Sequence, residues 1–107
     1  MSTLSVKTDI SNNAAIITLE GNLDSSTAPQ FHEAVQKVIP QNPQELVLDV
    51  EKLDFMASAG LRVIIFAKQK LGSTAKLILV KPQDQLIETL KMTGLLFSVT
   101  LVDHYPE

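Results

Sequence analysis

Residues that could catalyse a reaction are scattered along this chain rather than grouped. His32 and His104 are far apart in sequence, and neither has a second metal ligand or a nucleophile nearby. Asp49, Glu51 and Asp54 are close together but alternate along a predicted strand and its exit, which does not favour acid–base catalysis or metal binding. Cysteine is absent, and the 4 glycines form no phosphate-binding loop. The sequence therefore predicts neither an enzyme nor a bound cofactor or metal.

A small-residue turn at the start of a predicted helix is a better candidate for function. Ala57, Ser58, Ala59 and Gly60 form this turn. Ser58 either caps the free amides of the first helical turn or presents its hydroxyl for modification. Gly60 lies just inside the helix, where glycine costs about 1 kcal/mol relative to alanine, so we expect something to approach this backbone closely. A helix N-terminus also favours added negative charge, which makes a phosphate on Ser58 compatible with this position.

Three neighbours of this turn extend the hypothesis. Arg62 follows Ser58 by one helical turn, and helical side chains lean toward the N-terminus. Its guanidinium either reaches a phosphate on Ser58 or is simply solvated. Phe55 and Met56, which precede the turn, are either apolar anchors for a partner or core residues under the loop. The segment thus predicts a site for a partner protein.

Strands and helices alternate along the chain and must position this turn. Apolar runs predict strands at residues 5–10, 14–19, 46–50, 77–80 and 98–102. Helical spacing predicts helices at residues 29–38, 58–71 and 82–93, with Pro29 and Pro82 in first turns and Gly94 as a C-cap. The order β-β-α-β-α-β-α-β indicates one α/β domain over residues 1–107, a layer sandwich with a mixed, mostly parallel sheet. Residues 46–50 and 77–80 are the expected central strands, and the first two strands an antiparallel edge.

Some local expectations follow from the same patterns. Gly21 and Asn22 are expected to end the second strand, and residues 103–107 to form a frayed tail. The inward face of the helix at 58–71 is predicted to carry Leu61, Ile64, Ile65 and Leu71. Because the exits of parallel strands gather at one end of a sheet, Asp24, Ser25 and Thr27 are expected beside Ser58, with Ser25 or Thr27 also serving as a helix cap.

Composition narrows the class of partner. Apolar residues make up 45% of the 107 residues and charged residues 20%, a balance typical of globular domains. The net charge of −3 and the absence of a basic cluster argue against nucleic acid. The apolar runs fall far short of the roughly 18 residues that a membrane-spanning helix needs, and the N-terminus does not have the pattern of a secretory signal. We therefore expect a cytoplasmic protein without membrane insertion.

Three motifs together resemble the STAS domain family of bacterial anti-sigma-factor antagonists. The family's Asp-Ser-Ser-Gly-Leu or Asp-Ser-Ala-Gly-Leu signature is similar to Ala57-Ser58-Ala59-Gly60-Leu61, which follows Phe55-Met56. Its Gly-x-Leu-Asp pattern corresponds to Gly21-Asn22-Leu23-Asp24, followed by Thr27-Ala28. Its Gly-Leu pair before a phenylalanine corresponds to Gly94-Leu95-Leu96-Phe97. The resemblance covers nearly the whole chain.

The resemblance implies a partner switch. The unphosphorylated antagonist would bind an anti-sigma factor that is also a serine kinase of the histidine-kinase-like ATPase type. Phosphorylation of Ser58 would break the complex, and a metal-dependent serine phosphatase would restore it. The family's usual aspartate before the switch serine is replaced by Ala57. This departure keeps an alternative open, in which the chain is the STAS subunit of a lipid or anion transporter and is not phosphorylated.

Overall fold

The computed structural model describes residues 3–106. Strands β1 (Leu4–Ser11) and β2 (Ala14–Leu23) form a hairpin, followed by helix α1 (Ala28–Val38) and a short 3-10 helix, η1 (Ile39–Gln41). Strands β3 (Glu45–Asp49) and β4 (Leu53–Met56) come next, then helix α2 (Ser58–Leu71) and strand β5 (Lys76–Val80). Helix α3 (Asp84–Thr93), the 3-10 helix η2 (Leu95–Ser98) and strand β6 (Thr100–Val102) complete the described part.

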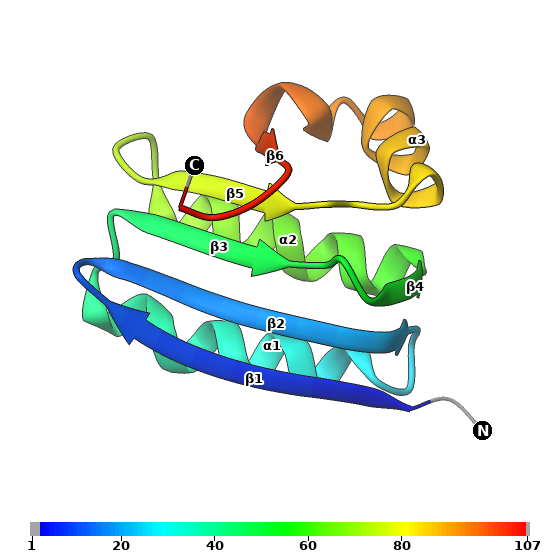
Figure 1. Ribbon diagram of the computed structural model, residues 1–107, viewed down its shortest axis with the longest axis horizontal. Coiled ribbons are helices and arrows are strands. Elements are labelled where there is room, and N and C mark those ends of the chain that lie inside the picture. Colours follow the sequence, from blue (N-terminus) through cyan, green and yellow to red (C-terminus); the bar gives the residue numbers. More distant parts are fainter. Residues whose placement is uncertain (1–2, 107) are drawn as a thin grey trace.

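The strands form one mixed sheet. Among the described residues its order is β1-β2-β3-β5-β6, and β4 pairs with the end of β2, beyond the segment that pairs with β3. The β1–β2 pair is antiparallel and the other pairs are parallel. Helices α1 and α2 lie behind the sheet in Figure 1, and α3 lies beyond its β5 side. The predicted α/β fold, its central strands β3 and β5 and its antiparallel edge are confirmed.

Both faces of the central strands are buried, which explains their continuous apolar sequence. Leu48 and Leu79 face the core cluster under α1 and α2, to which Phe31 and Ile64 contribute. Val47 and Ile78 face the opposite side, where they form a smaller cluster with Val80 and Val102. The helices thus cover one face of the sheet, and the second face needs another cover.

That cover includes the segment predicted to fray. Tyr105 packs against the smaller cluster, and its hydroxyl donates a hydrogen bond to a carboxylate oxygen of Glu45 at the start of β3. Figure 1 shows the red segment that follows β6 crossing in front of β5. The prediction of a frayed tail is therefore wrong for Tyr105, whose ring has an apolar surface to bury; Glu107 lies outside the described residues.

Other local predictions also need correction. Gly21 and Asn22 do not end the second strand, because β2 continues to Leu23 through an irregularity in its pairing with β4. Phe55 and Met56, expected in a loop, belong to β4. In α2, which spans the predicted residues, Ile65 is 38% exposed, and Val63 and Ala67 are buried in its place. The last strand begins at Thr100, because η2 occupies Leu95–Ser98.

Candidate functional site

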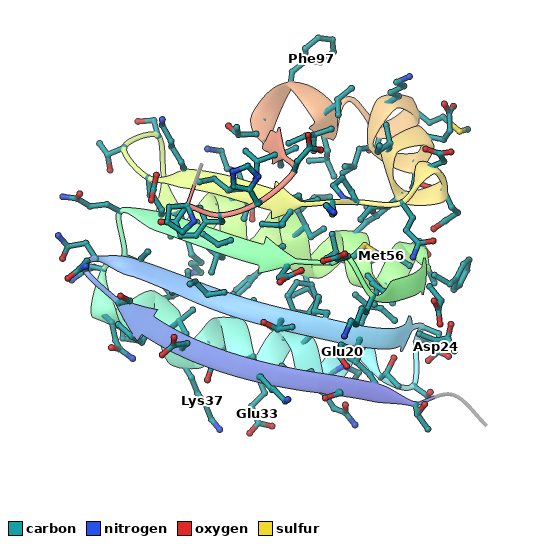
Figure 2. All side chains as sticks on the ribbon, viewed as in Figure 1. Glu20, Asp24, Glu33, Lys37, Met56 and Phe97 are labelled. Atoms are coloured by element: carbon teal, nitrogen blue, oxygen red, sulfur yellow. The ribbon has the colours of Figure 1, made fainter. Side chains whose placement is uncertain are left out.

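The ends of β2 and β4 bring two predicted site segments together. Leu23 is the register partner of Met56, and the backbone N–H of Ala57 donates to the Leu23 carbonyl at 2.8 Å. The next residues along the two segments are Asp24 and Ser58. Figure 2 shows the labelled Asp24 and Met56 at the same end of the sheet. The strands thus place the β2–α1 turn beside the start of α2, as the sequence predicted.

Ser58 is the first residue of α2 and is exposed. The N-cap is Ala57, with extended backbone angles (φ −85, ψ 172) and no side-chain hydrogen bond to the helix. The interpretation of Ser58 as the capping residue is therefore wrong. Its hydroxyl lies at the surface of a helix N-terminus, where free N–H groups and the helix dipole favour negative charge.

Gly60 is required by internal packing. A Cβ atom at this position would lie 2.7 Å from Leu23 Cδ2 and 2.7 Å from Met56 Cγ, closer than real Cβ contacts. The close approach expected at Gly60 therefore comes from the protein's own core. Gly60 is buried, and its lack of a side chain lets α2 start close to the ends of β2 and β4.

Asp24 organises the turn between β2 and α1. Its Oδ1 atom accepts hydrogen bonds from the N–H groups of Ser26 (2.9 Å) and Thr27 (3.2 Å) and from the Ser26 hydroxyl (2.7 Å). Thr27 is 4% exposed, and its hydroxyl donates to the carbonyl of Asn22 at 2.8 Å. Thr27 occupies the N-cap position of α1 without a side-chain capping bond. Asp24 and Thr27 thus shape the turn, and Ser25 is exposed on it.

The two apolar candidates have different surroundings. Met56 is 1% exposed and belongs to the core, so the prediction that it contacts a partner is wrong for this conformation. Phe55, one residue earlier on β4, is 44% exposed. A large aromatic side chain with this exposure, three residues before the exposed Ser58, is the kind of anchor that protein interfaces use. The structure therefore separates a core residue from a surface residue where the sequence left both alternatives open.

Sequence reasoning missed Gln85, which holds the outer edge of β4. Its Oε1 accepts from the Met56 N–H at 3.3 Å, and its Nε2 donates to the Met56 carbonyl at 3.2 Å. The side-chain amide thus supplies the two bonds that a neighbouring strand would supply. Thr89 accepts a further bond from Gln85 Nε2 at 3.3 Å. A polar residue on the first turn of α3 has no sequence signal that would distinguish this role from solvation.

The remaining candidate residues lie at the surface of α2 or outside the site. Arg62 is exposed one turn after Ser58, and Ala59 is partly buried between them. His32 contacts the ring of Phe66 edge-on at 4.5 Å between α1 and α2, while His104 is exposed beyond β6. Within residues 3–106 no cluster of histidine, aspartate and glutamate side chains could hold a metal ion.

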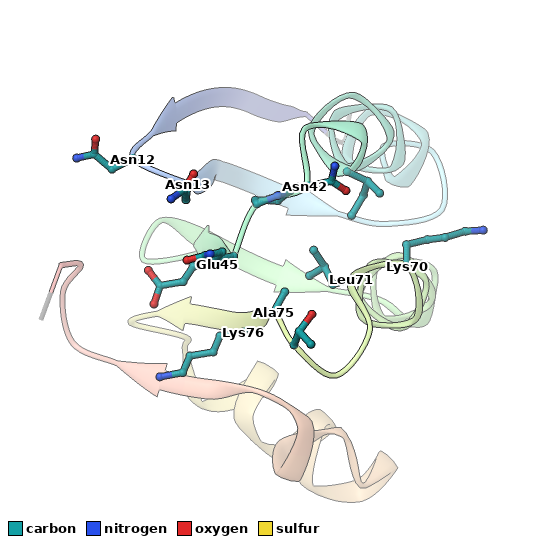
Figure 3. Close-up of a pocket in the computed structure, with 12 residues that line it drawn as sticks. Asn12, Asn13, Asn42, Glu45, Lys70, Leu71, Ala75 and Lys76 are labelled. Atoms are coloured by element: carbon teal, nitrogen blue, oxygen red, sulfur yellow. The ribbon is translucent and has the colours of Figure 1, made fainter.

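A cavity of about 580 Å³ lies at the opposite end of the sheet, where β3 and β5 begin. Figure 3 shows Asn12, Asn13 and Asn42 on its rim, with Glu45 and Lys76 from the first residues of the two strands. Ser58 does not line this cavity. The cavity therefore lies apart from the surface formed by the β2–α1 turn and the start of α2.

Together the mixed sheet, its helices and the serine-bearing α2 N-terminus define a STAS domain. A model of the STAS domain family matches residues 5–107, and the chain belongs to this family. None of the helices within residues 3–106 has the length and apolar character needed to cross a membrane.

Three similar proteins carry related names. The chain is 32% identical over 65 residues to the anti-sigma-F factor antagonist RsfB of Mycobacterium tuberculosis, covering 61% of this chain and 53% of RsfB. It therefore spans about half the length of that relative. It is 30% identical over 82 residues to BtrV of Bordetella bronchiseptica, which is named as a proposed anti-sigma factor antagonist, covering 76% and 71% of the two chains. The crystal structure of an anti-sigma factor antagonist from Mycobacterium paratuberculosis superimposes with a TM-score of 0.86 at 22% identity, covering 96% and 88%.

Proposed function

We propose that this chain is an anti-sigma factor antagonist that acts by partner switching, with Ser58 as the switch. The observation that supports this proposal is the exposed Ser58 hydroxyl at the first residue of α2, beside the β2–α1 turn. The names of RsfB and BtrV support the class of partner. They also favour the antagonist over the transporter subunit. The chain then acts as a binding module in the cytoplasm rather than as an enzyme.

The unphosphorylated form binds an anti-sigma factor that is also a serine kinase of the histidine-kinase-like ATPase type. Phe55, Ser25 and Arg62 are exposed around Ser58 and form the contact surface. Asp24, Ala57, Ala59 and Gly60 shape that surface through the turn and the close start of α2. Met56 supports it from the core.

Phosphorylation of Ser58 releases the partner. A phosphate adds about −1.5 to −2 charges at neutral pH, and the helix N-terminus tolerates them within the folded domain. The same charge on the docking surface must lose water or meet the partner's groups, which weakens the complex. Arg62, at i+4, gives the phosphate a charge-assisted contact within the domain. A metal-dependent serine phosphatase restores the binding form.

The test is phosphorylation by the cognate anti-sigma factor with ATP, followed by mass-spectrometric mapping of the modified residue. We expect modification at Ser58 alone, so the matched control variants Ser25→Ala and Ser26→Ala should still carry the phosphate on Ser58. Ser58→Ala should bind the partner constitutively, and Ser58→Asp should lose binding while keeping the wild-type unfolding temperature. Modification at another residue, or wild-type affinity of Ser58→Asp, contradicts the proposal.

A further inference from the structure

Strand β1 forms one edge of the sheet, and its outer side is unpaired within the described residues. It pairs with β2 over all eight of its residues, Leu4–Ser11, and lies at the end of the strand order. Figure 1 shows it as the lower border of the molecule. Residues 7–11 are all exposed, and Ile10 is 45% exposed. A long, exposed edge strand is a template for pairing with another strand.

The hairpin geometry determines which backbone groups this edge offers. Asn12 and Asn13 have positive φ angles (49 and 71), as in the two-residue turns that join antiparallel strands. Ser11 and Ala14 flank this turn as register partners, so Ser11 directs its N–H and C=O toward β2. Because the ladder alternates, Asp9, Lys7 and Ser5 do the same. The even-numbered residues, from Leu4 to Ile10, therefore direct their N–H and C=O groups outward.

We propose that two copies of this chain associate through β1, antiparallel, about a two-fold axis at Thr8. In this register Thr8 faces Thr8 of the second copy, Val6 faces Ile10, and Lys7 faces Asp9. Every outward N–H and C=O from residue 6 to residue 10 then has a partner. The symmetric arrangement repeats the Lys7–Asp9 and Val6–Ile10 pairs on both sides of the axis, and opposite-charge and apolar cross-strand pairs both stabilise a sheet.

The charges select this register over its neighbours. Moving the axis to Lys7 would place two lysines directly opposite each other, and moving it to Asp9 would place two aspartates there. Both arrangements are destabilising, because like charges on facing residues repel. A lysine on an edge strand normally opposes pairing, but here Asp9 lies two residues away on the same face of β1. Charge complementarity thus points to a second copy of this strand as the occupant.

Helix α1 adds a second complementary pair of charges. Figure 2 shows the labelled Glu33 and Lys37 projecting past β1 at the lower border of the molecule. Within one chain they form an i,i+4 ion pair at 3.5 Å, and both side chains are largely exposed. A two-fold axis perpendicular to the sheet keeps both α1 helices on the same face and runs them antiparallel. Glu33 of each copy then approaches Lys37 of the other.

The proposed dimer leaves both switch sites accessible. Ser58 lies at the end of the sheet where β2 and β4 terminate, and the axis passes through the middle of β1. Because the two-fold reverses strand direction, the two Ser58 residues lie at opposite ends of the continuous sheet. The dimer therefore presents two separate docking surfaces, and its formation does not depend on the proposed function of Ser58.

Charge reversal tests the register. We expect sedimentation velocity of the full chain to show a monomer–dimer equilibrium that shifts with concentration. Lys7→Asp and Asp9→Lys should each weaken self-association roughly tenfold or more, because each replaces two attractive pairs by two repulsive ones. The double variant Lys7→Asp/Asp9→Lys should restore it. Lys91→Asp, a matched reversal on α3, should leave it unchanged. A wild-type monomer at every concentration, or a double variant as weak as the single ones, overturns the proposal.

A single cysteine provides an independent test, because the chain contains none. Facing residues of a hydrogen-bonded antiparallel pair have Cα atoms about 5.5 Å apart, within the range of a disulfide. Thr8→Cys should therefore form a cross-linked dimer under mild oxidation. Ser5→Cys is the matched control on the same exposed strand, and its two copies would lie on the order of 20 Å apart. Equal cross-linking of the two variants would also overturn the proposal.

Discussion

Gln85 holds Met56 by both backbone groups, accepting from its N–H at 3.3 Å and donating to its carbonyl at 3.2 Å. Met56 is two residues before Ser58, so a side chain on α3 fixes the approach to α2 from the side opposite β2. The proposed partner surface therefore depends on a third element, distant in sequence from the small-residue turn.

Removing this amide should loosen the start of α2. Gln85→Ala leaves two backbone groups of a buried residue without their partners, at a cost of roughly 1 to 2 kcal/mol in the free energy of unfolding. Hydrogen exchange of the Met56 amide should accelerate, because that N–H loses its acceptor. Gln69→Ala, on the exposed surface of α2, is the matched control and should change neither quantity. Unchanged exchange at Met56 would show that the Gln85 bonds do not persist in solution.

A methyl group at Gly60 should destabilise the domain even though alanine favours helix. The added Cβ meets Leu23 and Met56 at 2.7 Å, and both side chains are buried. Overpacking of this kind costs typically 1–3 kcal/mol, against about 1 kcal/mol gained in helix propensity. Urea unfolding of Gly60→Ala, Met56→Ala and the double variant forms a thermodynamic cycle. The double variant should lose less than the sum of the single losses, because Met56→Ala vacates space for the methyl group; strict additivity would contradict the packing argument.

Most of the fold was predictable because its apolar patterns are strong. The buried strands β3 and β5 have continuous apolar sequences, and α2 begins and ends where helical spacing predicts. β4 was not predictable, because only Leu53 and Met56 of its four residues are buried, with exposed residues between them. The tail was missed for a related reason. Tyr105 is held in place by its hydrogen bond to Glu45 and by packing on an open apolar face of the sheet, and both partners are distant in sequence.

The position of the candidate site could be predicted from the sequence, but the separate roles of its residues could not. Sequence motifs placed Asp24 and Ser58 at converging strand ends, and the β2–β4 pairing brings those segments together. Burial separates Met56 from Phe55, and adjacent residues on an irregular strand give no sequence signal of which one faces inward. Gln85 was missed because its role is set by tertiary contact alone.

Two substitutions of Asp24 distinguish the effect of its hydrogen bonds on the turn from the effect of its negative charge. Asp24→Ala removes the carboxylate that accepts hydrogen bonds from Ser26 and Thr27, and it should lower stability by roughly 1 to 2 kcal/mol, as loss of a capping side chain does. Asp24→Asn keeps an oxygen acceptor without the charge and should stay near wild-type stability. If the carboxylate charge contributes to docking, Asp24→Asn should still lose partner affinity in calorimetry. Equal stability losses in both variants would indicate that the charge itself stabilises the turn.

The hydrogen bond between Tyr105 and Glu45 predicts that the free energy of unfolding falls at high pH. The hydrogen bond to Glu45, with desolvation and the nearby carboxylate charge, raises the pKa of Tyr105. The unfolded chain therefore releases this proton first, near pH 10. The stabilisation is complete below that pH and is lost as pH rises through the folded-state pKa. The chain has one tyrosine, so its ultraviolet absorbance follows Tyr105 directly, and Tyr105→Phe should show a shallower alkaline loss in urea unfolding. Equal slopes for both proteins would exclude the contact.

Alanine substitutions at Phe55 and Met56 should separate an effect on partner affinity from an effect on stability. Met56→Ala opens a cavity in the core and should cost roughly 2 to 5 kcal/mol of stability. Phe55→Ala removes a side chain that is 44% exposed and should change stability much less. Its affinity for the anti-sigma factor should fall by more than tenfold, about 1.4 kcal/mol, if Phe55 is an interface anchor. Titration calorimetry at a temperature where both variants are folded separates the two effects. Wild-type affinity of Phe55→Ala would remove Phe55 from the docking surface, and the contact would then rest on Ser25, Ser58 and Arg62.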